Sequence, residues 1–340
     1  VQLVDWNSAF DRQCHVLGVQ SFLENGVRKS IILLLISYFQ NRKMAVKWKG
    51  QFSKPRSLPG SGAQGGALGQ LEYLSQTNHN VDFMDEDMKY KFIDDLSLLE
   101  IINLYLPNEN VQSQSYLRKI EDWTEEKKMK INEEKCKYMV VNFTKKYQFS
   151  TRLSVGKSQL EEVSECKLLG LTLTNDLSFD KNTQNLIKNA FTRMIMLQKL
   201  VVFNIPLEDL LNIYQLYIRS VAEQSCVVWN SSLTLEQHMD IERIQKVALR
   251  IILHEQYENY ENALKITGLE TLRSRRKNLC LRFAQNCVKS EHNKRMFPVN
   301  TKVVNTRPHE KFVVTQARTE RLAKSSIPYM QRLLNECKSV

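Results

Sequence analysis

Two short stretches decide the fold of this chain: Val4-Asp5-Trp6-Asn7-Ser8-Ala9-Phe10-Asp11 near its start and Lys91-Phe92-Ile93-Asp94-Asp95-Leu96 further along. Each places a carboxylate at the end of an apolar stretch that is typical of a β-strand. Chemistry that moves phosphoryl groups with two divalent cations requires carboxylates that converge from separate strands, because hard cations prefer oxygen ligands. The two stretches therefore predict a site built from Asp5 and the Asp94–Asp95 pair.

The composition bounds what kind of protein this is. The chain has 340 residues, enough for two or three domains with sizeable cores. It carries 48 Lys and Arg residues against 37 Asp and Glu residues, for a formal net charge of +11. Such an excess favours a polyanionic partner, although a merely solvated basic surface gives the same composition.

Cysteine usage and hydropathy point to an intracellular protein. The seven cysteines are scattered, without a C-x-x-C pair or a zinc-type spacing to histidine, which favours reduced thiols. The longest apolar run, Ile31 to Ile36, is too short to span a bilayer and predicts a buried helix. No signal peptide is visible. We therefore expect a protein of the nucleus or cytoplasm, with no membrane partner.

The pattern of residues changes near position 175. Before it, short strands, helices and glycine turns alternate, whereas the remainder is almost wholly helical. We predict an α+β region over 1–175, a helical region over 176–260 and a basic helical C-terminal region over 261–340. The strands expected in the first region are 1–5, 43–48, 132–143, 166–173 and a hairpin over 90–102 with Asp94 and Asp95 at its tip. The helices expected there are 27–39, 71–77 and 114–128.

The second half contains amphipathic helices with cationic edges. Leu207, Leu210, Leu211, Tyr214 and Ile218 follow helical spacing, and so do Ile244, Val247, Ala248, Ile251 and Ile252. Arg243, Lys246 and Arg250 lie beside the second apolar face and are candidate contacts for nucleic-acid phosphates. A further helix is predicted to turn inward Leu272, Leu279, Phe283, Ala284 and Cys287, surrounded by Arg273, Arg275, Arg276, Lys277 and Arg282. A soluble helical bundle with solvated basic side chains is the alternative.

Further segments complete a series whose order is informative. They are Leu34-Leu35-Ile36-Ser37-Tyr38-Phe39-Gln40-Asn41-Arg42, Gln64-Gly65-Gly66-Ala67-Leu68-Gly69, Trp123 with Met129-Lys130-Ile131-Asn132-Glu133-Glu134-Lys135, Leu168-Leu169-Gly170, Leu216-Tyr217-Ile218-Arg219, Val227-Val228-Trp229 and Glu242-Arg243-Ile244-Gln245-Lys246. With the two opening stretches, this series resembles the reverse transcriptases of non-long-terminal-repeat, LINE-type retrotransposons, near the jockey-like branch. The match covers nearly the whole chain.

The resemblance implies an RNA-directed DNA polymerase that transfers nucleotides to a primer 3′-hydroxyl. Its partners would be an RNA template, a DNA primer and a deoxynucleoside triphosphate. Its fold would be a palm, an antiparallel sheet with helices on one face, followed by an all-α thumb. Asp5, Asp94 and Asp95 would hold two Mg²⁺ ions, which Mn²⁺ can replace.

The resemblance also implies roles for residues around the metal site. Phe10 matches the steric gate that excludes a ribose 2′-hydroxyl, with a core aromatic as the alternative. Gln64 and Gly65 would contact the incoming nucleotide. Lys135 matches a position proposed to protonate the leaving pyrophosphate, with an exposed strand lysine as the alternative. We expect Asp11 to be structural, because metal ligation in the family belongs to the first Asp of its motif.

The family places its fingers before the first palm motif. Four residues precede Asp5 in this sequence, so we expect a fragment whose fingers are missing. Two other functions stay open at this stage. The chain could be a catalytically inactive retroelement remnant, or one co-opted for nucleic-acid binding. A helical protein-interaction module over 180–290 is the third interpretation.

Overall fold

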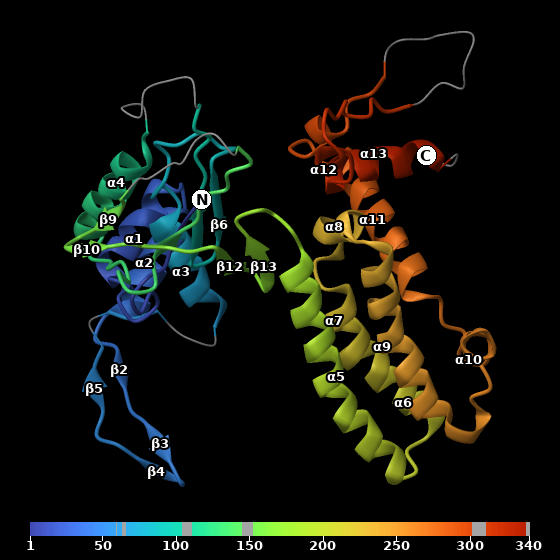
Figure 1. The fold of residues 1–340 in the computed structure, drawn as a ribbon. Helices are drawn as coiled ribbons and strands as arrows, with labels where there is room; N and C mark the ends of the chain where they lie inside the picture. Colours follow the sequence, from blue (N-terminus) through green and yellow to red (C-terminus); the bar gives the residue numbers. More distant parts are fainter. Residues whose placement is uncertain (59, 63–65, 104–110, 145–151, 301–310, 338–340) are drawn as a thin grey trace. The chain divides into compact units, whose positions relative to one another are not determined.

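The chain divides into two compact units, Val1–Ser164 and Glu165–Val340 (Figure 1). The computed structural model describes residues 1–58, 60–62, 66–103, 111–144, 152–300 and 311–337. The division precedes the hairpin of β12 (Glu165–Leu168) and β13 (Leu171–Thr174), because β13 contacts the first helix of the second unit. The sequence pattern placed the change one hairpin later, near 175.

A five-stranded sheet forms the centre of the first unit, in the order β11-β8-β1-β7-β6. Its strands are β1 (Gln2–Val4), β6 (Lys89–Phe92), β7 (Asp95–Leu98), β8 (Lys137–Tyr138) and β11 (Glu161–Glu162). All neighbouring pairs are antiparallel except β8 and β11, which run parallel. The expected purely antiparallel sheet therefore gains a parallel edge strand.

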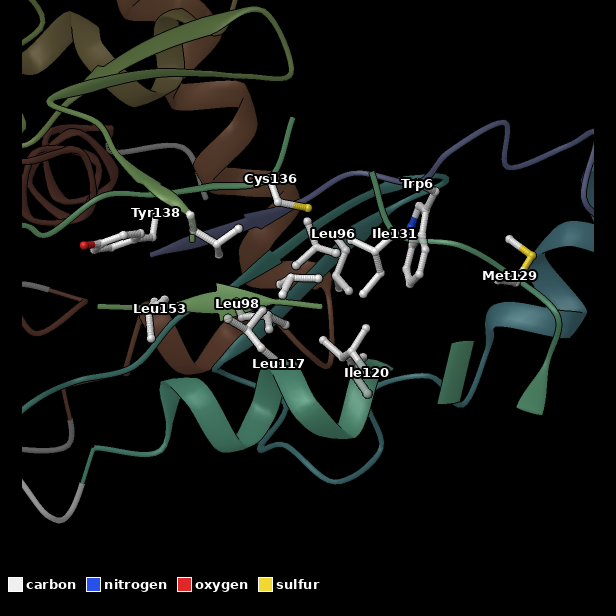
Figure 2. Packing of buried hydrophobic residues seen from close by; sticks show 14 of the residues in the cluster. Trp6, Leu96, Leu98, Leu117, Ile120, Met129, Ile131, Cys136, Tyr138 and Leu153 are labelled. Carbon is white, nitrogen blue, oxygen red and sulfur yellow. The ribbon is translucent and has the colours of Figure 1, made fainter. Parts of the chain in front are cut away.

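Helices α3 (Ala67–Thr77) and α4 (Ser113–Glu126) contribute to the core of this unit, together with the sheet. Leu117 and Ile120 of α4 lie beside Leu96 and Leu98 of β7 (Figure 2). These side chains are buried because helical spacing puts Leu117, Ile120 and Thr124 on one face of α4. This is the helix that the sequence predicted over 114–128. Both predicted helices are confirmed, with α3 beginning four residues early.

Helices α1 (His15–Glu24) and α2 (Lys29–Phe39) form a smaller cluster of their own. The expectation that the run Ile31 to Ile36 is buried is wrong for four of its six residues. Ile32 and Leu35 are buried, whereas Leu33 and Leu34 are 67% and 68% exposed. A helix turns 100° per residue, so one packing neighbour covers only alternate parts of a continuous apolar run.

Short two-stranded pieces complete the strands of the first unit. They are β2 (Lys43–Met44) with β5 (Arg56–Ser57), β3 (Lys47–Trp48) with β4 (Gln51–Phe52), and β9 (Ser154–Val155) with β10 (Ser158–Gln159). The strand predicted over 43–48 is therefore split between two exposed ladders. Lys49 and Gly50, both with positive φ, form the turn between β3 and β4.

The second unit is helical beyond its β12–β13 hairpin. Its longer helices are α5 (Asp180–Val202), α6 (Leu207–Ile213), α9 (Leu235–Leu253), α10 (Tyr260–Thr267), α11 (Leu272–Lys289) and α13 (Ser326–Glu336). Its shorter turns are η2 (Tyr214–Arg219, π-helical), α7 (Ser220–Glu223), α8 (Cys226–Trp229), η3 (Asn230–Ser232), η4 (His254–Gln256), η5 (Lys294–Met296) and α12 (Glu320–Ala323). None of the described helices is both long and apolar enough to cross a membrane.

The core of the second unit is built around Trp229, Tyr214 and the apolar face of α9. Trp229 is fully buried and donates its indole N–H to the carbonyl of Gln224 at 2.9 Å. Helix α9 begins with a capping box between Thr234 and Gln237, which satisfies two backbone N–H groups that the first turn leaves unpaired.

Two predictions for α11 are wrong. Phe283 is exposed, because Cys280, Ala284 and Cys287 define the buried face and Phe283 lies one position off it. Arg276, expected among the surface cations, is completely buried. Four residues separate Arg276 from Leu272 and from Cys280, so helical spacing places it on the same buried face.

Candidate functional site

Asp5 directly follows the central strand of the first unit, and its backbone is fixed from both sides. Its N–H donates to the Cys136 sulfur at 3.4 Å, and its carbonyl accepts from the N–H of Asn132 at 2.8 Å. Burial raises the pKa of the Cys136 thiol to about 11, so this group is neutral at physiological pH. One oxygen of the Asp5 carboxylate, Oδ2, is buried and has no hydrogen bond among the described residues.

Asp94 and Asp95 lie where the β6–β7 hairpin turns, as the sequence predicted. Phe92 pairs with Asp95, so Ile93 and Asp94 form the turn. Ile93 has a φ of 55°, a left-handed conformation that is costly for a β-branched residue. In the neighbouring ladder Val4 pairs with Leu96, which places Asp5 and Asp95 one residue further along adjacent antiparallel strands.

The three aspartates influence one another electrostatically. The pKa of the Asp95 carboxyl is raised, first by burial and then by the charges of Asp94 and Asp5. Tyr73 of α3 is fully buried behind them, and its hydroxyl has no hydrogen-bond partner among the described residues. Burial, and then Asp94, Asp5 and Asp95, raise the pKa of this hydroxyl. The site is thus a concentration of negative charge beside a neutral phenol.

The donor chemistry of this site fits Mg²⁺. Its oxygens are carboxylate oxygens, and one of them, Oδ2 of Asp5, is buried without a hydrogen bond among the described residues. A cation would offset the repulsion that raises the pKa of Asp95. Within the described residues, however, no three His, Cys, Asp or Glu side chains are already gathered closely enough to hold an ion. Ligation of metal by Asp5, Asp94 and Asp95 therefore stays a prediction.

Phe10 lies beside the aspartates through its contact with Tyr73, at 5.0 Å between ring centroids. The segment 60–62 runs along the same stretch: Gly62 N–H donates to the Phe10 carbonyl at 2.8 Å. A Cβ at position 62 would meet the end of the Gln13 side chain, which would have to move to make room. Gln64 and Gly65, the predicted nucleotide contacts, lie outside the described residues.

Lys135 is brought to the site by the turn that begins at Asn132. Its Nζ lies 3.6 Å from Asp5 Oδ2, while its side chain is 71% exposed. An ion pair this exposed adds little stability, so the lysine is free to move between Asp5 and another anion. The sequence predicted Lys135 as a site residue but not its contact with Asp5.

Arg243, Lys246 and Arg250 belong to the second unit and lie exposed on α9. Lys246 sits over the ring of Tyr260 at 5.2 Å, and Arg250 over that of Tyr257 at 5.3 Å. In both contacts the charged group lies over the face of an aromatic ring, a cation–π interaction that leaves the residue exposed. Their contact with nucleic acid stays a prediction.

Sequence reasoning missed Tyr73 and Cys136 as neighbours of the site, and it missed the burial of Glu72 in the same helix as Tyr73. Helical spacing in α3 carries the signal for Tyr73, since Gly69, Tyr73 and Thr77 lie four residues apart and all are buried. Glu72 has no such signal. It is fully buried, and neither carboxylate oxygen has a hydrogen-bond partner among the described residues.

Glu72→Gln is expected to stabilise the first unit at alkaline pH. Burial raises the pKa of Glu72 from 4.5 to about 7, against a smaller opposing effect of Arg42. Because the folded-state pKa is the higher one, the free energy of unfolding falls as pH rises from 4.5 towards 7. The variant should lose this slope and be more stable by about 1–2 kcal/mol at pH 8.

Urea unfolding followed by tryptophan fluorescence at pH 5 to 8 measures the effect of Glu72→Gln. Three of the four tryptophans, Trp6, Trp48 and Trp123, belong to the first unit. Glu125→Gln on exposed α4 is the matched control and should keep the wild-type pH profile. Equal slopes in wild type and Glu72→Gln would show that Glu72 is not the titrating group.

Comparisons with known proteins identify distant relatives of the chain. No protein-family model matches the chain. Over 206 residues, 58% of the chain, it is 26% identical to the probable RNA-directed DNA polymerase from transposon BS of Drosophila melanogaster. Over 257 residues, 73% of the chain, it is 23% identical to the corresponding protein from transposon X-element of the same organism. The aligned parts cover 22% and 28% of these relatives. The chain thus has distant homology to transposon RNA-directed DNA polymerases, which supports a reverse transcriptase-like function.

Proposed function

We propose that this chain carries the catalytic aspartates of a retrotransposon RNA-directed DNA polymerase of the non-LTR, LINE type. The first unit would be its palm and the helices from α5 onward its thumb. One observation carries the proposal. Asp5 and Asp95 lie at the same end of two neighbouring antiparallel strands, with Asp94 beside them, and a cation would offset the repulsion between their charges.

Each residue of the site would have its own role in nucleotidyl transfer. Asp5, Asp94 and Asp95 would hold Mg²⁺, which when bound supplies charge neutralisation and an acidified primer hydroxyl. Lys135, exposed and 3.6 Å from Asp5, would donate a proton to the departing pyrophosphate. Phe10, packed on Tyr73, would limit the space at the sugar 2′ position. The Asp5 backbone, fixed by Cys136 and Asn132, would keep its carboxylate oriented.

Primer extension on an RNA template tests the proposal. Extension by the chain, and by the chain joined to the fingers of a related polymerase, is measured with and without Mg²⁺. We expect extension that depends on the metal and is lost when Asp94 and Asp95 are both changed to Ala. Equal extension by that double variant would overturn the site assignment. Salt-dependent RNA binding without any extension would instead favour an inactive nucleic-acid-binding remnant.

Phe10→Val is expected to relax sugar discrimination in the same assay. Removing the ring opens space beside Tyr73, so the preference for deoxynucleotides over ribonucleotides should fall by about 10- to 100-fold. Competition between the two triphosphates in single-nucleotide extension measures the ratio. Phe52→Val in the exposed β4 strand is the control and should leave it unchanged. An unchanged ratio for Phe10→Val would favour the core-aromatic interpretation.

A further inference from the structure

The second unit contains a polar cavity of about 510 Å³ that none of the predicted roles uses. We call it the α11 cavity. Its walls come from η3, α9, α11 and α13, and the lining residues on which the argument rests are Ser231, His238, Arg273, Lys277, Tyr329 and Glu336. Because these elements belong to the same compact unit, the cavity is a feature of one packed body.

A completely buried cation, Arg276, lies behind the wall of this cavity. Its Nε donates to Asn230 Oδ1 at 3.0 Å and its Nη2 to His238 Nδ1 at 3.3 Å, and both partners line the cavity. Its Nη1 is buried without a hydrogen bond, and no carboxylate forms an ion pair with it among the described residues. Burial lowers the pKa of Arg276, while the charges of Glu242 and Glu223 raise it.

The bond from Arg276 fixes how His238 faces the cavity. An arginine only donates, so Nδ1 of His238 must accept and the proton sits on Nε2. Burial, and then Arg276 and Arg273, lower the pKa of His238 to about 4, so the ring is neutral at physiological pH. The ring therefore offers the cavity one N–H donor and no acceptor. The hydroxyl of Ser231, buried without a partner, is a second available donor.

Two cations line the cavity, and they differ in their partners. Lys277 is paired with Glu336 at 3.1 Å, whereas no ion pair is found for the Arg273 side chain in the described part of the chain. Two other carboxylates nearby are already engaged. Glu242 accepts the backbone N–H groups of Leu272 and Arg273 and the hydroxyl of Tyr260, and Glu270 accepts the hydroxyl of the lining residue Ser274 at 3.2 Å. The first amides of α11 are thus already satisfied, and any ligand must be held by side chains.

We infer that the α11 cavity binds a phosphate group. Its donors approach from four different elements, which suits a tetrahedral oxyanion with several acceptor oxygens better than a planar carboxylate. Arg273 would contact the anion directly, and Arg276 would act behind His238 and Asn230 as a buried positive charge. This inference does not depend on the aspartate site of the first unit.

Titration of the whole chain with inorganic phosphate tests this site. The imidazole signals of His238 are followed by NMR at constant ionic strength, with acetate and chloride as matched anions. We expect phosphate alone to shift these signals in a saturable way, and Arg273→Ala to weaken the affinity by about fivefold or more, because a charge-assisted hydrogen bond is lost.

Arg282→Ala is the matched control for Arg273→Ala, since both residues are exposed on α11 but only Arg273 lines the cavity. Binding of phosphate should be unchanged in this control. Equal loss in both variants, or equal shifts with acetate and chloride, would overturn the inference. Circular dichroism confirms that each variant is folded.

Oligonucleotides distinguish the source of the phosphate. A single-stranded oligonucleotide with a 5′-phosphate competes with inorganic phosphate at His238 if the cavity takes a terminal phosphate. Equal competition by the 5′-hydroxyl form identifies a backbone phosphodiester instead. Binding of inorganic phosphate with no competition by either oligonucleotide indicates a free phosphate ligand.

Discussion

Asp5→Asn is expected to lower Mg²⁺-dependent primer extension by about 1,000-fold, because the amide keeps the shape of the side chain but removes one of three negative charges that would hold the metal. The stability of the fold should not decrease. Asp5 contributes to the repulsion that raises the pKa of Asp95, so its neutralisation should leave the unfolding temperature equal or higher. Extension rates, Mn²⁺ binding and thermal unfolding together measure these effects.

Asp11→Asn is the matched control for Asp5→Asn. It makes the same chemical change in the same motif, at an exposed position that we expect to be structural. Extension by Asp11→Asn should stay within a few-fold of wild type, about the scale of a surface substitution. If Asp11→Asn loses extension while Asp5→Asn retains it, the assignment of the first metal ligand is reversed.

Trp229→Ala is expected to destabilise the second unit by about 3–5 kcal/mol. The side chain is completely buried in the core, its indole N–H is bonded to Gln224, and Arg276 lies over its ring at 5.9 Å. Truncation therefore leaves a cavity and an unpaired carbonyl beside a buried cation. Circular dichroism at 222 nm measures the change, since the second unit holds most of the helix.

Trp48→Ala controls for loss of a tryptophan as such. Trp48 is 73% exposed in the β3–β4 ladder, so its removal should change stability by no more than about 0.5 kcal/mol. In Trp229→Ala the remaining tryptophans all report the first unit. A Trp229→Ala protein as stable as wild type would mean that the core around α9 tolerates the cavity.

The sequence predicted most elements because their signals are local. Period-two alternation marks the β6–β7 hairpin, and helical spacing marks α4, with Leu117 and Ile120 inward. The two strand-like stretches on either side of Asp94 and Asp95 place this pair at a turn, and that prediction needs no knowledge of the fold. Local patterns carry no information, however, about which strands become neighbours, so the parallel pairing of β11 with β8 was not predicted.

Burial was the other quantity that local patterns failed to predict. Arg276 and Glu72 are both fully buried, although charged side chains are rarely enclosed in a protein. Leu33 and Leu34 are apolar and yet exposed. In each case the surroundings are set by elements distant in sequence. The contact of Lys135 with Asp5 and the place of Tyr73 depend on the same long-range packing.

The position of β1 in the sheet has a consequence for how the protein is made. This strand lies between β7 and β8, and its Gln2 pairs with both Leu98 and Tyr138. A ribosome synthesises β1 long before either partner, so the nascent strand must wait unpaired until the rest of the unit emerges. We expect β1 to be the strand of this sheet that depends most on chaperones during synthesis.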